Sequence, residues 1–169
     1  MAIIQASDFV GVINVSKNKH ETSDLDLFIS TYEKKYMIDL FGFGIYENFI
    51  ADLTVSTPQT PQTSPFTDIF TDFEIEHDHS YGLKYMLEQF VYFEWLNVQW
   101  LKKTASGVVA VDSENSTVRG ATRTQISTKY NDAVKQYKLI QCYINDNLDL
   151  FETGGKEFTG VEKNYIALI

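Results

Sequence analysis

The longest run compatible with a helix, from Tyr81 to Lys102, is also the most apolar part of the chain. It contains no proline, and its only glycine, Gly82, stands at the start. Apolar residues recur at steps of three and four, and further aromatic residues widen the apolar stripe past half of the helix circumference. Such a helix must be covered on several sides, by its own chain or by other copies. We therefore expect Phe90 and Trp95 to be buried.

Further helical patterns lie on both sides of this stretch. Residues 22–41 carry apolar side chains at a helical period. The range begins with a Thr-Ser pair, either of which can cap the helix, and its first turn is acidic, as the helix dipole favours. Gly42 ends this helix, and residues 45–53 supply a second, shorter one. A third long helix starts at about Thr124 and ends before Gly154.

These patterns predict a mainly α fold. We expect one domain over residues 1–169: a helical bundle of three principal helices, packed antiparallel or nearly so, with a short β-strand or hairpin segment and extended loop and tail arms. A chain of this length buries roughly two thirds of its unfolded surface in one core. Near the start, Ser7 and Asp8 precede Phe9 and predict one short helix.

Three segments fall outside the principal helices. The Pro-, Thr- and Gln-rich residues 54–65 hold all three prolines and indicate a solvent-exposed loop, with a domain linker as the alternative. Residues 104–117 contain valines that favour a strand without an evident partner. The tail, 156–169, is too short to bury its own apolar residues. We predict that these last two segments are docking elements, ordered by neighbouring subunits; the candidate interface residues are Val108, Val109, Val111, Phe158, Val161, Tyr165, Ile166 and Ile169.

Charge and composition narrow the class of function. The net charge of -9, from 14 Lys plus Arg against 23 Asp plus Glu, argues against a surface that neutralises phosphates. Aromatic residues make up 14% of the chain, which fits either packing in protein interfaces or a well-filled core. Neither a signal peptide nor a run of about eighteen apolar residues is present, so we expect neither secretion nor a membrane span. The one cysteine, Cys142, is expected to be a buried, inert thiol in a reducing, intracellular setting.

Few residues suggest chemistry. The best metal-ligand candidates stand between Glu74 and His79, but His77 and His79 lack the spacing of a helical metal site, and a solvated acidic loop is the favoured interpretation. The chain has no GxSxG elbow, and the GFG at Gly42 is not a phosphate-binding loop because no GK[ST] follows it. We therefore predict no catalytic residues, no metal site and no cofactor, and no enzyme.

The order of the segments nevertheless resembles that of a known class of proteins. Four stretches carry the likeness: STYEKKYMIDLFGFGIYENF; YGLKYMLEQFVYFEWL; TASGVVAVDSENST; and ISTKYNDAVKQYKLIQCYI with its tail FTGVEKNYIALI. In this order and spacing they resemble the head-to-tail connector (adaptor, or neck ring) proteins of tailed phages, particularly those of Bacteroidetes-infecting and crAss-like phages. The likeness spans nearly the whole chain, except for TPQTPQTSP, which is not a feature of that family.

The resemblance implies a structural virion protein at the head-tail interface, assembled in the host cytoplasm. It implies a ring of about twelve copies, bound to the phage portal protein on one side and to another neck or tail protein on the other, with DNA passing through the channel without sequence-specific binding. An acidic chain suits such a channel because DNA slides past without sticking. Two alternatives are a non-viral helical protein-protein interaction module and, less favoured, a metal-dependent hydrolase centred on His77 and His79.

Overall fold

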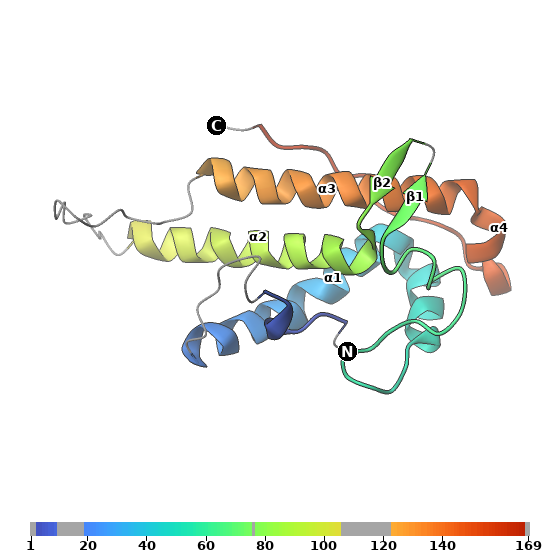
Figure 1. The fold of residues 1–169 in the computed structure, drawn as a ribbon, viewed down its shortest axis with the longest axis horizontal. Helices are drawn as coiled ribbons and strands as arrows, with labels where there is room; N and C mark the ends of the chain where they lie inside the picture. The colour runs from blue at the N-terminus through green and yellow to red at the C-terminus, as the bar shows by residue number, and fades with distance from the viewer. Residues whose placement is uncertain (1–2, 10–18, 76, 106–122, 168–169) are drawn as a thin grey trace.

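The computed structural model describes residues 3–9, 19–75, 77–105 and 123–167, and it is mainly helical, as predicted (Figure 1). Two long helices, α2 (Gly82–Ala105) and α3 (Arg123–Asp146), lie side by side and run in opposite directions. Helix α1 (Lys19–Asp52) crosses α2 on its other side and also contacts α3. The predicted bundle of three principal helices is confirmed.

Aromatic rings fill the centre of this bundle. Phe90 of α2 is fully buried, as predicted, and stacks on Tyr36 of α1 with 4.1 Å between ring centroids. The Phe90 and Tyr137 rings, the latter on α3, pack edge to face with 6.1 Å between their centroids. Trp95 is only half-buried, so the prediction for this residue holds in part. The apolar stripe of α2 is thus covered by the two other helices of the same chain.

Helix α1 breaks at Gly42, where the sequence predicted a helix end. Gly42 has φ 73° and ψ 164°, a conformation that L-residues with a side chain rarely adopt. The break divides α1 into the two predicted helices and redirects the second toward Asp52. It also releases the carbonyl groups just before Gly42 from their helical partners.

The small sheet lies at a place that the sequence analysis assigned to a loop. Strands β1 (Phe73–Ile75) and β2 (Asp78–Ser80) form an antiparallel hairpin, so the prediction of an acidic loop here is wrong. Both strands are tied to α3: the Phe73 ring packs on Tyr143 with 5.2 Å between centroids, and the Ser80 hydroxyl donates to Gln136 Oε1 at 3.0 Å. The strand predicted at Val108, Val109 and Val111 lies outside the described residues.

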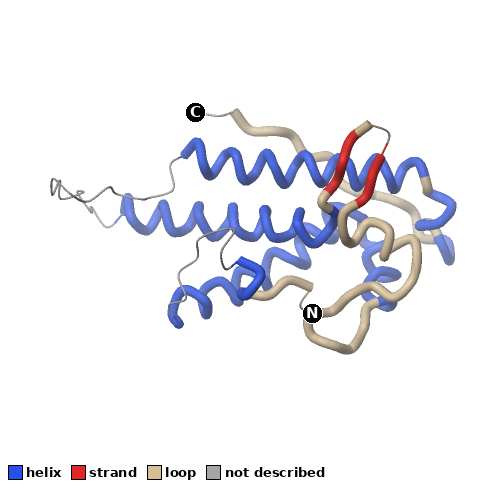
Figure 2. Tube along the Cα trace, in the orientation of Figure 1, coloured by secondary structure: helices blue, strands red, loops and turns tan. Residues whose placement is uncertain are grey.

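Residues 54–65 form a mostly exposed loop, in accordance with the sequence (Figure 2). The loop is folded rather than extended. The Asp52 carboxylate accepts hydrogen bonds from the backbone N–H groups of Gln62 at 2.9 Å and Thr63 at 3.1 Å. The following residues place Phe66, Ile69 and Phe70 in the core. The loop is therefore held against the end of α1 and leads directly into residues of the core.

Both ends of the chain carry short helical turns. The predicted short helix near the start is a 3-10 helix, Ala6–Phe9. At the other end α3 stops at Asp146 and is followed by α4 (Leu148–Phe151) and a 3-10 turn, Thr153–Gly155. Cys142 is exposed on α3, so the prediction of a buried thiol is wrong. The inward side of α3 at this level is occupied by Ile140 and Ile144, which turn position 142 outward.

Candidate docking surface at the C-terminal strap

The residues after α4 return across the helices as an extended segment, which we call the C-terminal strap (residues 156–167). It passes the second part of α1, crosses the break at Gly42 and ends over the first half of α3 (Figure 1). Its first contact is an ion pair between Lys156 Nζ and Glu47 Oε2 at 2.6 Å. Close approach is possible here because Gly42 and Gly44 have no side chains: a Cβ on Gly44 would lie 3.2 Å from that of Lys156.

The break in α1 supplies the main backbone contact of the strap. The Asp39 carbonyl, released from its helical partner, accepts the N–H of Val161 at 2.6 Å. It also accepts the Tyr137 hydroxyl at 2.6 Å, and the same hydroxyl reaches the Val161 carbonyl. Burial raises the pKa of the Tyr137 phenol, and the charge of Asp39 adds to this effect. The phenol therefore stays protonated and donates its one hydrogen to these two carbonyls in turn.

Lys163 is the strongest charged contact of the strap. Its side chain is only 13% exposed, and its Nζ lies 2.7 Å from Asp39 Oδ2. Three rings surround the ammonium group, with centroids at 5.0 Å for Tyr36, 5.4 Å for Tyr137 and 5.9 Å for Phe90. A lysine in such a setting is held by a carboxylate and by the negative faces of aromatic rings together.

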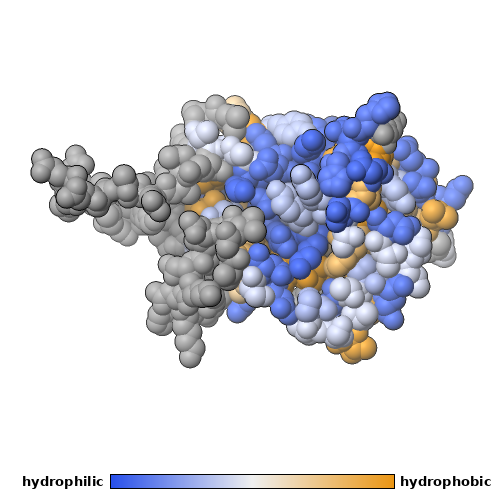
Figure 3. All heavy atoms as spheres, viewed as in Figure 1, coloured by the Kyte–Doolittle hydropathy of each residue, from blue (hydrophilic) through white to orange (hydrophobic). Residues whose placement is uncertain are grey.

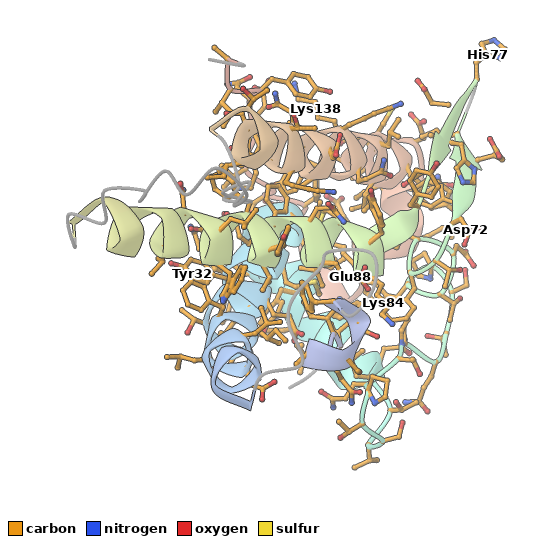
Figure 4. All side chains as sticks on the ribbon, turned by 60° about the vertical axis from the view of Figure 1, so that its left-hand side comes forward. Tyr32, Asp72, His77, Lys84, Glu88 and Lys138 are labelled. Atoms are coloured by element: carbon orange, nitrogen blue, oxygen red, sulfur yellow. The ribbon has the colours of Figure 1, made fainter. Side chains whose placement is uncertain are left out.

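The far end of the strap is held by a single side chain of α3. Asn131 accepts the Ile166 N–H at its Oδ1 and donates from its Nδ2 to the Ile166 carbonyl, both at 2.9 Å. This pair of bonds is the contact that a neighbouring strand would make. Lys138, on the outer side of α3, lies over the Tyr165 ring at 4.7 Å (Figure 4).

The strap exposes apolar side chains among charged and polar ones such as Glu157 and Glu162. Val161 and Tyr165 are each 53% exposed and Ile166 is 39% exposed, whereas Phe158 packs partly against the core. These four were predicted as interface residues; the other four, Val108, Val109, Val111 and Ile169, lie outside the described residues. By contrast, on the face drawn in Figure 3 the apolar residues form small separate patches in a mostly polar surface.

The structure corrects one expectation about this tail. We predicted that it is ordered by neighbouring subunits rather than by its own fold, and its backbone is instead held by α1 and α3 of the same chain. The reason is the break at Gly42, which offers the Asp39 carbonyl as a partner. An interface role for the exposed side chains stays a prediction.

Sequence reasoning missed the residues that bind the strap. Asp39, Tyr36, Tyr137 and Asn131 stand within helical patterns, where nothing in their spacing marks them as partners of a distant tail. The GFG at Gly42 was the available signal. A glycine pair at a helix end also permits a second chain segment to cross closely, and we had used it only as a helix stop.

The residues considered for metal binding do not converge. His77, at the tip of the hairpin, points away from the body of the molecule (Figure 4). His79 Nδ1 pairs with Glu74 Oε1 at 2.8 Å across the two strands. Among the described residues, no group of three or more His, Cys, Asp or Glu side chains is arranged to hold a metal ion.

Comparisons with known proteins found no match among protein-family profiles, curated proteins or solved structures. Within the described part of the chain, no helix has the length and apolarity needed to cross a membrane. The case for a function therefore depends on the strap and on the resemblance of the segments.

Proposed function

We propose that this protein is a structural subunit of a phage neck, a head-to-tail connector that forms a ring between the portal and the tail or neck proteins and lines the DNA channel. The exposed apolar residues of the strap carry the proposal. Val161, Tyr165 and Ile166 stand on a segment whose backbone is held by hydrogen bonds at Val161 and Ile166, so their side chains meet a partner without a large ordering cost.

The charge of the chain supports the same role. A subunit with a net charge of -9 has no excess of cations to grip DNA, which suits a wall past which DNA moves. The resemblance of segment order to the connector family supplies the specific place in the virion.

Assembly of the purified protein tests the proposal. Native mass spectrometry and electron microscopy, alone and with the portal protein of the same phage, should show a closed ring of identical subunits that binds the portal. Replacing Val161, Tyr165 and Ile166 with serine should abolish the ring and leave a folded monomer.

A matched control replaces two other exposed apolar residues, Leu27 and Val55, with serine. This control should assemble like the wild-type protein. A wild-type chain that stays monomeric in the presence of portal, or that is absent from purified virions, would contradict the proposal.

A further inference from the structure

The binding site for the strap is built from residues far from it in sequence. Asp39 and Tyr36 of α1 and Tyr137 and Asn131 of α3 form this site, which we call the strap-binding face. All of its contacts are made to backbone groups or to the one side chain of Lys163. Nothing in these contacts requires the strap and the face to belong to the same molecule.

The connection between the strap and the body has the properties of a hinge. Gly154 and Gly155 both have positive φ, 66° and 73°, and a Cβ on either would meet no atom within 4 Å. Glycines without packing contacts change their backbone angles at little cost, and a few such residues suffice for a large reorientation. The two glycines therefore allow the strap to change direction while α4 stays in place, once the strap contacts and the hydrogen bond from the Phe158 N–H to Glu152 Oε1 at 2.8 Å are broken.

We propose that in the assembled ring the strap of each subunit lies on the strap-binding face of a neighbouring copy, with the neighbour's Lys163 between Asp39 and the three aromatic rings. This inference rests on the proposed function, because it concerns the same ring. Exchange of an identical element between copies is a low-cost route to assembly, since every contact of the closed monomer is made again.

The exposed side chains of the strap favour the exchanged form over the closed one when subunits assemble. In the closed monomer Val161, Tyr165 and Ile166 remain largely in water. In the exchanged form the strap lies between two subunits, and the same side chains become covered while the inner contacts are unchanged. In dilute solution each subunit keeps its own strap, because the short connection gives the strap a high effective concentration at its own face. When subunits are held side by side, the strap-binding face of a neighbour competes for the strap.

A disulfide reports which copy supplies the strap. A Cβ on Gly44 would lie 3.2 Å from the Lys156 Cβ, so a shift of a few tenths of an ångström brings the pair into the range of roughly 3.5 to 4.5 Å found in disulfides. The variant Gly44→Cys, Lys156→Cys, in a Cys142→Ser background, is oxidised once as a dilute monomer and once after assembly. Denaturing electrophoresis without reductant then separates bonds within a chain from bonds between chains, and Lys156→Cys alone in the same background controls for chance collisions.

We expect monomers from the dilute sample and a ladder of covalent multimers from the assembled one. Assembled rings in which every disulfide stays within one chain, or in which no disulfide forms, would overturn the exchange and leave the proposed function standing. Failure to assemble at any concentration, with portal present, would overturn both.

The wild-type protein provides a second measurement that needs no substitution. Lys156 Nζ lies 2.6 Å from Glu47 and Lys163 Nζ lies 2.7 Å from Asp39, so a carbodiimide joins each pair directly. Rings assembled from equal amounts of ¹⁴N- and ¹⁵N-labelled chains should give cross-linked peptide pairs of mixed isotope. Pairs of a single isotope throughout would show that each strap stays on its own subunit.

Discussion

The N-terminal segment, residues 3–9, and the C-terminal strap both lie across the helices, and they are held by different kinds of contact. Ile3, Ile4 and Phe9 are fully buried, whereas Val161 and Tyr165 of the strap are half exposed. The N-terminal segment thus contributes side chains to the core, and the strap contributes mainly backbone groups and two lysines, Lys156 and Lys163, to a surface.

Acidic residues of α1 hold both ends: Glu33 binds the N-terminal segment, whereas Asp39 and Glu47 bind the strap. Glu33 is 1% exposed, and its Oε2 accepts the N–H groups of Ile3 at 3.0 Å and Ile4 at 3.2 Å. Asp39 binds the strap through both its carbonyl and its carboxylate, at the edge of the bundle. Burial of apolar side chains makes a chain end part of the domain, whereas polar anchoring at the surface leaves it detachable.

The largest expected effect is at the N-terminal segment. Phe9→Ala should lower the free energy of unfolding by roughly 3 to 5 kcal/mol, because the ring is fully buried and its loss leaves a cavity. Thermal or urea unfolding measures the change. Val161→Ala, at the strap, should stay within about 0.5 kcal/mol of wild type. Equal losses at the two positions would break the comparison.

Glu33 offers a test of the polar contact beneath that segment. Glu33→Leu should cost about 2 to 3 kcal/mol, because two buried N–H groups lose their acceptor. Glu33→Gln keeps a carbonyl oxygen at the site and should be close to wild type at neutral pH. Burial raises the pKa of Glu33, and the hydrogen bonds from the Ile3 and Ile4 N–H groups oppose this rise. Urea unfolding of both variants separates the effect of losing the hydrogen bonds from the effect of losing the charge. Similar losses of unfolding free energy in both variants would mean that the charge of Glu33 contributes more than its hydrogen bonds.

Glu88 of α2, near the N-terminal segment, should confer a pH dependence. Glu88 lies beside Lys84, which pairs with Asp8 at 3.1 Å (Figure 4). Burial raises the pKa of Glu88 to about 7; Lys84 opposes this and Asp8 adds to it. The folded state therefore binds the proton more tightly than the unfolded state, and stability falls as pH rises from the ordinary glutamate value toward 7.

Glu88→Gln should remove this slope and raise the stability at pH 8 by about 1 kcal/mol, a value reduced for the partly exposed position of the side chain. Denaturant unfolding at pH 5 and pH 8 provides the measurement. A variant that keeps the full wild-type slope would show that other groups cause it.

The smallest global effect is expected at the strap itself. Lys163→Met removes the ion pair with Asp39, and the strap should detach rather than leave an unpaired charge buried, so global stability changes by about 1 kcal/mol or less. Hydrogen exchange at the Val161 and Ile166 amides should become at least about tenfold faster. Lys156→Met, which removes a more exposed ion pair, is the control and should change exchange less. Unchanged protection in Lys163→Met would show that the backbone contacts alone hold the strap.

Much of the bundle could be predicted from residue order alone. The apolar stripe from Tyr81 onward, the break at Gly42 and the helix from about Thr124 depend on local periodicity and on glycine, which act within a few residues. The secondary structure of residues 73–80 could not be predicted in the same way. Their acidic composition suggests a loop, and the hairpin exists because Phe73 and Ser80 meet α3.

The position of the C-terminal tail was decided by the tertiary structure. Its sequence shows apolar residues without enough chain to bury them, which correctly marks Val161, Tyr165 and Ile166 as exposed. It does not show that the Asp39 carbonyl, more than a hundred residues earlier, lacks a helical partner and accepts the tail. Periodicity records which side of an element is apolar, whereas an unpaired carbonyl and a cage of rings around Lys163 arise only when α1, α2 and α3 have packed together.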